Sequence, residues 1–123
     1  MFTDIHNCCM LLGTADDILI LCHKSPDGDT IGAAYGLYHA LTQLGRRAAV
    51  RCSDPLPEKF AYIHGGIEMP EFEPQLIIAV DIAGPGLLGP ALEQYADRVD
   101  LCIDHHVSNS DYARLTLLDA QAA

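Results

Sequence analysis

Residues 18–32 read ILILCHKSPDGDTIG, and the interpretation of the whole chain starts from this stretch. Ile18–Cys22 is an unbroken apolar run of strand length, as expected for a strand that is buried on both faces of a sheet. A helix-like pattern follows over residues 31–44. Between the two lie one histidine and two aspartates, within residues 23–29. A turn needs the proline and glycine found there, but an imidazole and two carboxylates are costly to crowd together unless a cation binds them. The stretch therefore predicts a metal site at the end of a strand.

Length and composition predict one globular domain, residues 1–123, with 50% hydrophobic residues. The apolar runs are too short to span a membrane, and the N-terminus lacks the basic start of a signal peptide, so we expect a cytoplasmic protein. The formal net charge of −10 is unsuited to binding a nucleic-acid backbone unaided. It suits a site that concentrates cations, so metal ions or a further domain would have to supply positive charge to a phosphate substrate.

The rest of the chain alternates strand and helix patterns joined by short loops. Such alternation predicts an α/β fold with a parallel, doubly wound, Rossmann-like sheet flanked by helices. Further strands are expected at residues 48–52, 75–80, 99–103 and 115–118, and further helices at residues 2–13, 58–63 and 88–96.

Three of the apolar runs end in Asp or His, at Cys22–His23, Val80–Asp81 and Ile103–Asp104. In open α/β sheets, ligands bind beyond the carboxyl ends of the strands, and in a parallel sheet these ends share one edge. The sequence therefore places the following side chains in one crevice: His23, Asp27, Asp29, Asp81, Asp104, His105 and His106.

Imidazole and carboxylate ligands without thiolate suit manganese, with magnesium, cobalt or zinc as competitors. So many ligands predict two ions bridged by a carboxylate, and paired ions about 3.5–4 Å apart catalyse phosphoester hydrolysis. Single residues could instead have purely structural roles: Asp27-Gly28-Asp29 could be an ordinary turn, and Asp81 could be a helix N-cap. A G-x-G-x-x-G after the first strand and a G-x-S-x-G are both absent, which disfavours dinucleotide binding and serine hydrolysis.

The spacing of these residues resembles that of the DHH phosphoesterase family. The family has H-x-x-x-D-x-D after its first strand, an Asp after a middle strand, and D-H-H after a later one. Here these motifs stand as residues 23–29, Asp81 and residues 104–106. The resemblance implies an N-terminal DHH domain, and it is strongest for the branch of short-oligoribonucleases and 3′-phosphoadenosine-5′-phosphate phosphatases.

The resemblance also implies a role for each matching residue. His23 and Asp27 would hold one manganese ion, Asp29 and His105 the other, and Asp81 would bridge the two. Asp104 and His106 would be catalytic: Asp104 would orient its neighbours, and His106 would face the scissile phosphate or assist the bridging water. Ser108 and Asn109 are expected to shape the loop beneath the phosphate and to contact substrate.

Two departures from the family pattern bear on these expectations. The family has a further metal-binding aspartate on a later strand, and neither Asp111 nor Asp119 is expected to have that context. The family also has a C-terminal substrate-binding domain, which this sequence lacks, so we expect a domain that is incomplete at its C-terminal end.

The function implied by the resemblance is hydrolysis of short single-stranded RNA or of phosphoadenosine phosphate, by a chain that could form a homodimer. Cyclic-dinucleotide or pyrophosphate hydrolysis is the alternative within the family. An interpretation of another class is an inactive metal-binding fragment with an assembly or regulatory role.

Overall fold

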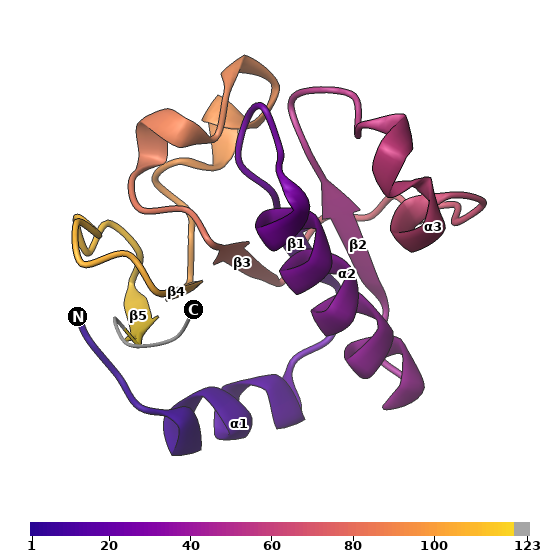
Figure 1. The fold of residues 1–123 in the computed structure, drawn as a ribbon. Helices are drawn as coiled ribbons and strands as arrows, with labels where there is room; N and C mark the ends of the chain where they lie inside the picture. Colours follow the sequence, from indigo (N-terminus) through magenta and orange to yellow (C-terminus); the bar gives the residue numbers. More distant parts are fainter. Residues whose placement is uncertain (120–123) are drawn as a thin grey trace.

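Short apolar runs form a parallel sheet of five strands, in the order β2-β1-β3-β4-β5. The computed structural model describes residues 1–119, so the last four residues of the expected domain lie outside it. Figure 1 shows the arrangement. The strands are β1 (Ile18–Leu21), β2 (Ala48–Arg51), β3 (Leu76–Val80), β4 (Leu101–Asp104) and β5 (Leu115–Leu118). Every residue of β1 and β3 is buried, which explains why their sequences do not alternate between apolar and polar residues. The predicted α/β class and parallel sheet are confirmed.

Helices cover one face of the sheet, where side chains such as Ile20, Ile78 and Leu101 form the larger apolar cluster. On this face lie α1 (Ile5–Thr14), α2 (Gly28–Gln43) and α3 (Ala61–His64), the last preceded by the 3₁₀ turn η1 (Glu58–Phe60). In Figure 1, α2 crosses in front of β1 and β2. The longest helix, α2, has 16 residues, and within residues 1–119 no helix is both long and apolar enough to cross a membrane.

The other face of the sheet is covered by a segment whose predicted form is wrong. The sequence predicts one α-helix over residues 88–96, but the structure has the 3₁₀ helix η2 (Pro85–Leu87) before this region and the 3₁₀ helix η3 (Pro90–Tyr95) within it. Gly89 separates them with a φ of +86°, and Pro90 begins the second turn. A left-handed residue followed by proline cannot belong to a continuous α-helix, so the apolar residues Leu88 and Leu92 are buried from turns instead.

The second helix begins earlier than the apolar pattern indicates, at Gly28 rather than Ile31. Asp27 is its N-cap, because the side-chain Oδ1 accepts a hydrogen bond from the backbone N–H of Thr30 at 3.0 Å. The H-x-x-x-D-x-D stretch is therefore both a strand end and a helix start.

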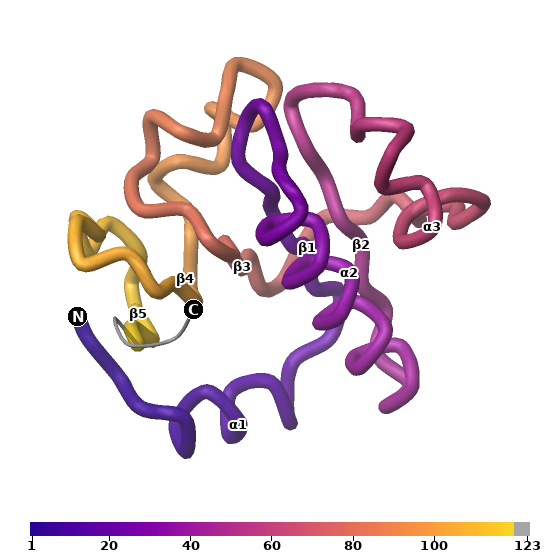
Figure 2. The backbone as a smooth tube through the Cα atoms, viewed as in Figure 1, coloured from indigo at the N-terminus to yellow at the C-terminus, as the bar shows by residue number. Residues whose placement is uncertain are grey.

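The strand order reverses between β1 and β3, since the chain moves from β1 outward to β2 and then returns to the other side of β1. Ligands bind at such switch points in doubly wound sheets. Figure 2 shows the loops after β1, β2 and β3 rising together on one side of the molecule. At the far edge, the N-terminal residue Phe2 pairs in parallel with Thr116 of β5.

Candidate metal centre

Asp81 lies at the centre of the candidate site, directly after β3. Its backbone has φ +60°, an uncommon conformation for a residue with a side chain, and its N–H donates to the carbonyl of Ile103 at 2.8 Å. The alternative role of Asp81 as a helix N-cap is wrong, because no helix begins there. The buried carboxylate instead lies 2.8 Å from Nε2 of His105 and 3.8 Å from Nδ1 of His106, measured from Oδ1.

Asp81 belongs to two groups of potential metal ligands. The first contains His23 and Asp27, whose ligand atoms lie with that of Asp81 within 4.8 Å of one another. Nδ1 of His23 is 2.6 Å from the backbone carbonyl of Lys24, so Nδ1 carries the proton and Nε2 presents its lone pair toward the carboxylates. This is the arrangement that orients a metal-binding histidine.

The second group joins Asp81 to the strand end of β4, through Asp104, His105 and His106. The side chain of Asp104 is fully buried, and its Oδ1 lies 2.6 Å from Nδ1 of His106. The same oxygen accepts the backbone N–H of His105 at 2.8 Å. Asp104 is therefore saturated by its neighbours, which suits an orienting role.

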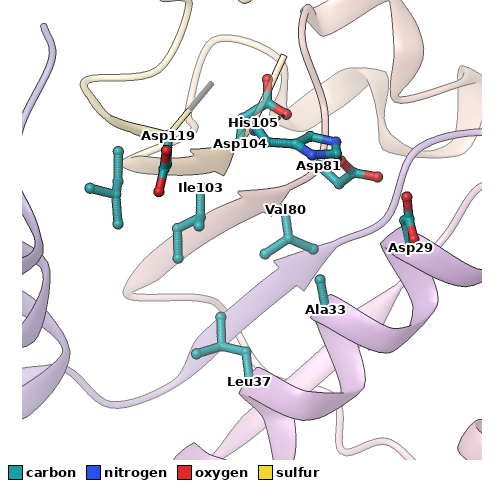
Figure 3. A pocket seen from close by; sticks show the side chains of 10 residues that line it. Asp29, Ala33, Leu37, Val80, Asp81, Ile103, Asp104, His105 and Asp119 are labelled. Atoms are coloured by element: carbon teal, nitrogen blue, oxygen red, sulfur yellow. Dashed lines mark hydrogen bonds and ion pairs between the residues drawn. The ribbon is translucent and has the colours of Figure 1, made fainter. Parts of the chain in front are cut away.

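Asp29 stands outside both groups and faces the site from the first turn of α2. It lines a cavity of about 330 Å³ together with Asp81, Asp104 and His105, as Figure 3 shows. The floor of the cavity is apolar and is formed by side chains of α2 and of three strands, namely Ala33, Leu37, Val80, Ile103 and Leu117. Of the predicted residues, Asp29 thus lies across the cavity from Asp81, Asp104 and His105.

Asp119 directly follows a strand, contrary to the expectation from the sequence. It directly follows β5, its backbone N–H donates to the carbonyl of Asp104 at 3.1 Å, and it lines the same cavity. Its signal is present in the sequence, because Leu115–Leu118 is a short, mostly apolar segment followed by an aspartate, as are the runs before Asp81 and Asp104. Asp111, in contrast, lies away from the cavity and accepts hydrogen bonds from the Met1 ammonium group and from Thr116.

The two loop residues expected to contact substrate differ in their surroundings. Ser108 is exposed, whereas the side-chain amide of Asn109 donates to Oδ2 of Asp104 at 2.8 Å. Nearby, the half-buried hydroxyl of Tyr112 donates to the carbonyl of Ile82 at 2.9 Å, beside Asp81. The sequence carries no signal for these contacts, because they depend on how the loop folds back.

Electrostatics at the site favour a cation. Burial raises the pKa of Asp81, and the nearby His105 and His106 only partly offset this effect. For Asp104, burial also opposes ionisation, but hydrogen bonds from Asn109, His106 and two backbone amides hold its pKa below the usual value. The hydrogen bond to Asp104 raises the pKa of His106. Burial disfavours the ionised form of Asp81, whereas a bound divalent ion would stabilise it.

The donor set therefore fits a pair of divalent ions. Two clusters of imidazole and carboxylate ligands share one buried carboxylate, and thiolates are absent from both. Asp81 belongs to both groups, and its role as a bridging ligand, like that of Asp29 as a ligand of the second ion, stays a prediction.

Comparison with known proteins finds similar sequences. The model of the DHH family, N-terminal domain, matches residues 17–122. The bifunctional oligoribonuclease and PAP phosphatase NrnA of Thermus thermophilus is 32% identical over 112 residues, which cover 86% of this chain and 33% of that protein. The chain thus spans about a third of the length of this curated relative.

A solved structure is also similar in fold. It is that of an exopolyphosphatase-related protein from Bacteroides fragilis, with a TM-score of 0.82, 23% sequence identity, and coverage of 96% of this chain and 39% of that one. This likeness concerns the fold alone, while the family match extends over most of the sequence. The chain therefore belongs to the DHH family, of which it carries the N-terminal domain.

Proposed function

We propose that this chain is the catalytic core of a two-metal, manganese-dependent phosphoesterase. The observation that carries the proposal is the position of Asp81, whose buried carboxylate belongs to both groups of ligands. His23 and Asp27 would hold one ion, and His105 with Asp29 would hold the other. Magnesium, cobalt or zinc could replace manganese, because the same donors bind them.

We further propose short oligoribonucleotides or phosphoadenosine phosphate as substrates. The support is the 32% identity to a protein described as an oligoribonuclease and PAP phosphatase. Since this chain has a net charge of −10 and spans about a third of that relative, we propose that residues 1–123 form a catalytic domain and that substrate binding needs polypeptide beyond it. A cytoplasmic location and a homodimer remain predictions.

The reaction would use the residues as follows. When bound, a pair of divalent ions supplies Lewis acidity toward water and phosphate. The hydrogen bond to Asp104 keeps a proton on Nδ1 of His106. The side chain of His106 is 43% exposed, and its other ring nitrogen is Nε2. The raised pKa of His106 favours a second proton at Nε2, which could pass to the leaving oxygen of the ester.

Manganese titration tests the metal assignment. We expect two ions per chain by calorimetry, and we expect Asp81→Asn to abolish tight binding of both, because one shared ligand is lost. The exposed Asp97→Asn variant is the control, since it removes the same charge away from the site. Unchanged two-site binding in Asp81→Asn would contradict the bridging role, and one ion or none in the unaltered chain would favour the inactive metal-binding module.

Turnover tests the substrate class. We expect the 123-residue chain alone to cleave RNA dinucleotides only weakly with manganese, because it spans a third of the relative's length. Dinucleotides, phosphoadenosine phosphate, a cyclic dinucleotide and pyrophosphate should be compared by product chromatography. Robust turnover of dinucleotides by this chain would show that the proposed further polypeptide is dispensable, and preference for pyrophosphate would overturn the substrate assignment.

A further inference from the structure

Asn109 is held in one orientation by partners on both sides of its side-chain amide. Nδ2 donates to Oδ2 of Asp104 at 2.8 Å, while Oδ1 accepts the backbone N–H of Asp111 at 2.7 Å. Exchanging the two amide atoms would place an oxygen against a carboxylate and an N–H against an N–H. The partners therefore determine which end of the amide faces Asp104.

Asp104 depends on this contact because its side chain is fully buried. Oδ1 already accepts hydrogen bonds from the backbone N–H of His105 at 2.8 Å and from Nδ1 of His106 at 2.6 Å. The second oxygen, Oδ2, is the one that accepts from Asn109. A buried carboxylate oxygen that loses its partner is unfavourable, and rotation of the carboxylate would then compete with its bond to His106.

We propose that Asn109 is a positioning residue that holds Asp104 so that His106 keeps its proton on Nδ1 and presents Nε2 to the substrate. The expectation that Asn109 contacts substrate stays a prediction, and its amide is bound by Asp104 and Asp111. The catalytic meaning of this contact rests on the proposed phosphoesterase function, whereas the effect on the proton of His106 does not.

The loop is anchored by contacts that do not involve the Asn109 side chain. The backbone N–H of Ser110 donates to the carbonyl of Ala83 at 2.9 Å, and the Tyr112 hydroxyl donates to the carbonyl of Ile82 at 2.9 Å. The backbone N–H of Asn109 also donates to the carbonyl of His106 at 3.0 Å. Variants at Asn109 can therefore lose the amide contact while the loop keeps its path.

The decisive measurement is the tautomer of His106, read from ¹⁵N-labelled histidine by NMR on the metal-free chain in mildly alkaline buffer. We expect the Nδ1–H form in the unaltered protein and a mixture with Nε2–H in Asn109→Asp, which replaces the donor by a carboxylate, and in Asn109→Leu. Val107→Ala, an exposed change in the same loop, should leave the tautomer unaltered.

Three results would overturn the proposal: an Nε2–H form in the unaltered protein, an unchanged tautomer in both Asn109 variants, or an unchanged kcat in those variants. The first needs no variant, so it applies even if neither variant folds. In any form of the protein that turns over substrate, we expect Asn109→Leu to lower kcat about 10- to 100-fold while KM and manganese affinity change little. Absence of all turnover in the unaltered protein would count against the phosphoesterase function and leave the NMR result to decide the role of Asn109.

Discussion

Gly89 allows loops at the edge of the site to pack closely against one another. Its φ of +86° is in the left-handed region, and a Cβ at this position would lie 2.6 Å from Cβ and Oγ of Ser53 and 3.2 Å from Cβ of Lys24. Ser53 also accepts the backbone N–H of Ala91 at 2.9 Å. The glycine therefore allows the turn after β3 to approach the loops that follow β1 and β2.

Replacing Gly89 by alanine should destabilise the protein. The left-handed backbone alone costs a residue with a side chain about 1–3 kcal/mol, and the contact with Ser53 adds to this. The free energy of unfolding, measured by urea denaturation, should fall accordingly. Gly86→Ala is the matched control, because a Cβ added there would meet no neighbouring atom within 4 Å, and equal losses in the two variants would contradict the explanation.

At the scale of elements, the amino ends of β1 and β2 are joined through Asp16. Its Oδ1 accepts the backbone N–H of Arg47 at 2.7 Å and that of Asp17 at 2.9 Å. The hydrogen bonds from these two amides hold the pKa of Asp16 below its ordinary value of 3.8. Ionised Asp16 thus ties the start of one strand to the start of its neighbour.

This pairing predicts a pH-dependent stability. A carboxyl group whose pKa is lower in the folded state stabilises the fold above its unfolded pKa, and the contribution is lost as the pH falls through the folded pKa. Asp16→Asn should therefore reduce the free energy of unfolding at neutral pH, and its difference from the unaltered protein should shrink well below pH 3.8. Urea denaturation at both pH values checks this, with exposed Asp97→Asn as the charge control; a difference that does not depend on pH would exclude the mechanism.

The central strands β1 and β3 could be predicted from the sequence because they are buried throughout, and burial on both faces requires an unbroken apolar run. The segment at residues 88–96 could not, because its leucines have helical spacing while Gly89 and Pro90 dictate turns. The spacing of apolar residues indicates which residues are buried. The backbone conformations that glycine and proline favour decide whether those residues lie in an α-helix or in turns. Asp119 is harder to predict for a different reason, because β5 contains the polar Thr116 and is only partly buried, so the strand before this aspartate is less distinct in the sequence.

At the scale of the whole molecule, the meeting of residues from three strand ends could be predicted, because parallel strands share an edge. Their division into two groups around Asp81 is expected from the family resemblance alone, and the local geometry that produces it could not be predicted. It depends on the left-handed backbone of Asp81, on the capping role of Asp27 and on the loop that brings Asn109 to Asp104. These features arise from local hydrogen bonds that have no periodic signal in the sequence.

The excess of 17 acidic over 7 basic residues predicts that manganese stabilises the fold. Four aspartates line one cavity, and an ion that binds only the folded state at about 100 times its Kd adds about 2.7 kcal/mol to the free energy of unfolding. The Tm measured by calorimetry should rise with manganese and return on addition of a chelator. Sodium chloride at equal ionic strength separates binding from screening, and an equal rise with salt alone would show that no specific site is involved.

The pairing of Phe2 with Thr116 also has a consequence for solubility. The outer edge of β5 would otherwise present unpaired backbone groups, and such edges are templates for intermolecular strand addition and aggregation. The backbone N–H of Thr3 and the carbonyl of Met1 instead bond to Thr116, each at 2.8 Å. The first three residues thus protect the sheet edge. An affinity tag fused before Met1 would remove the ammonium group that binds Asp111, next to these backbone hydrogen bonds.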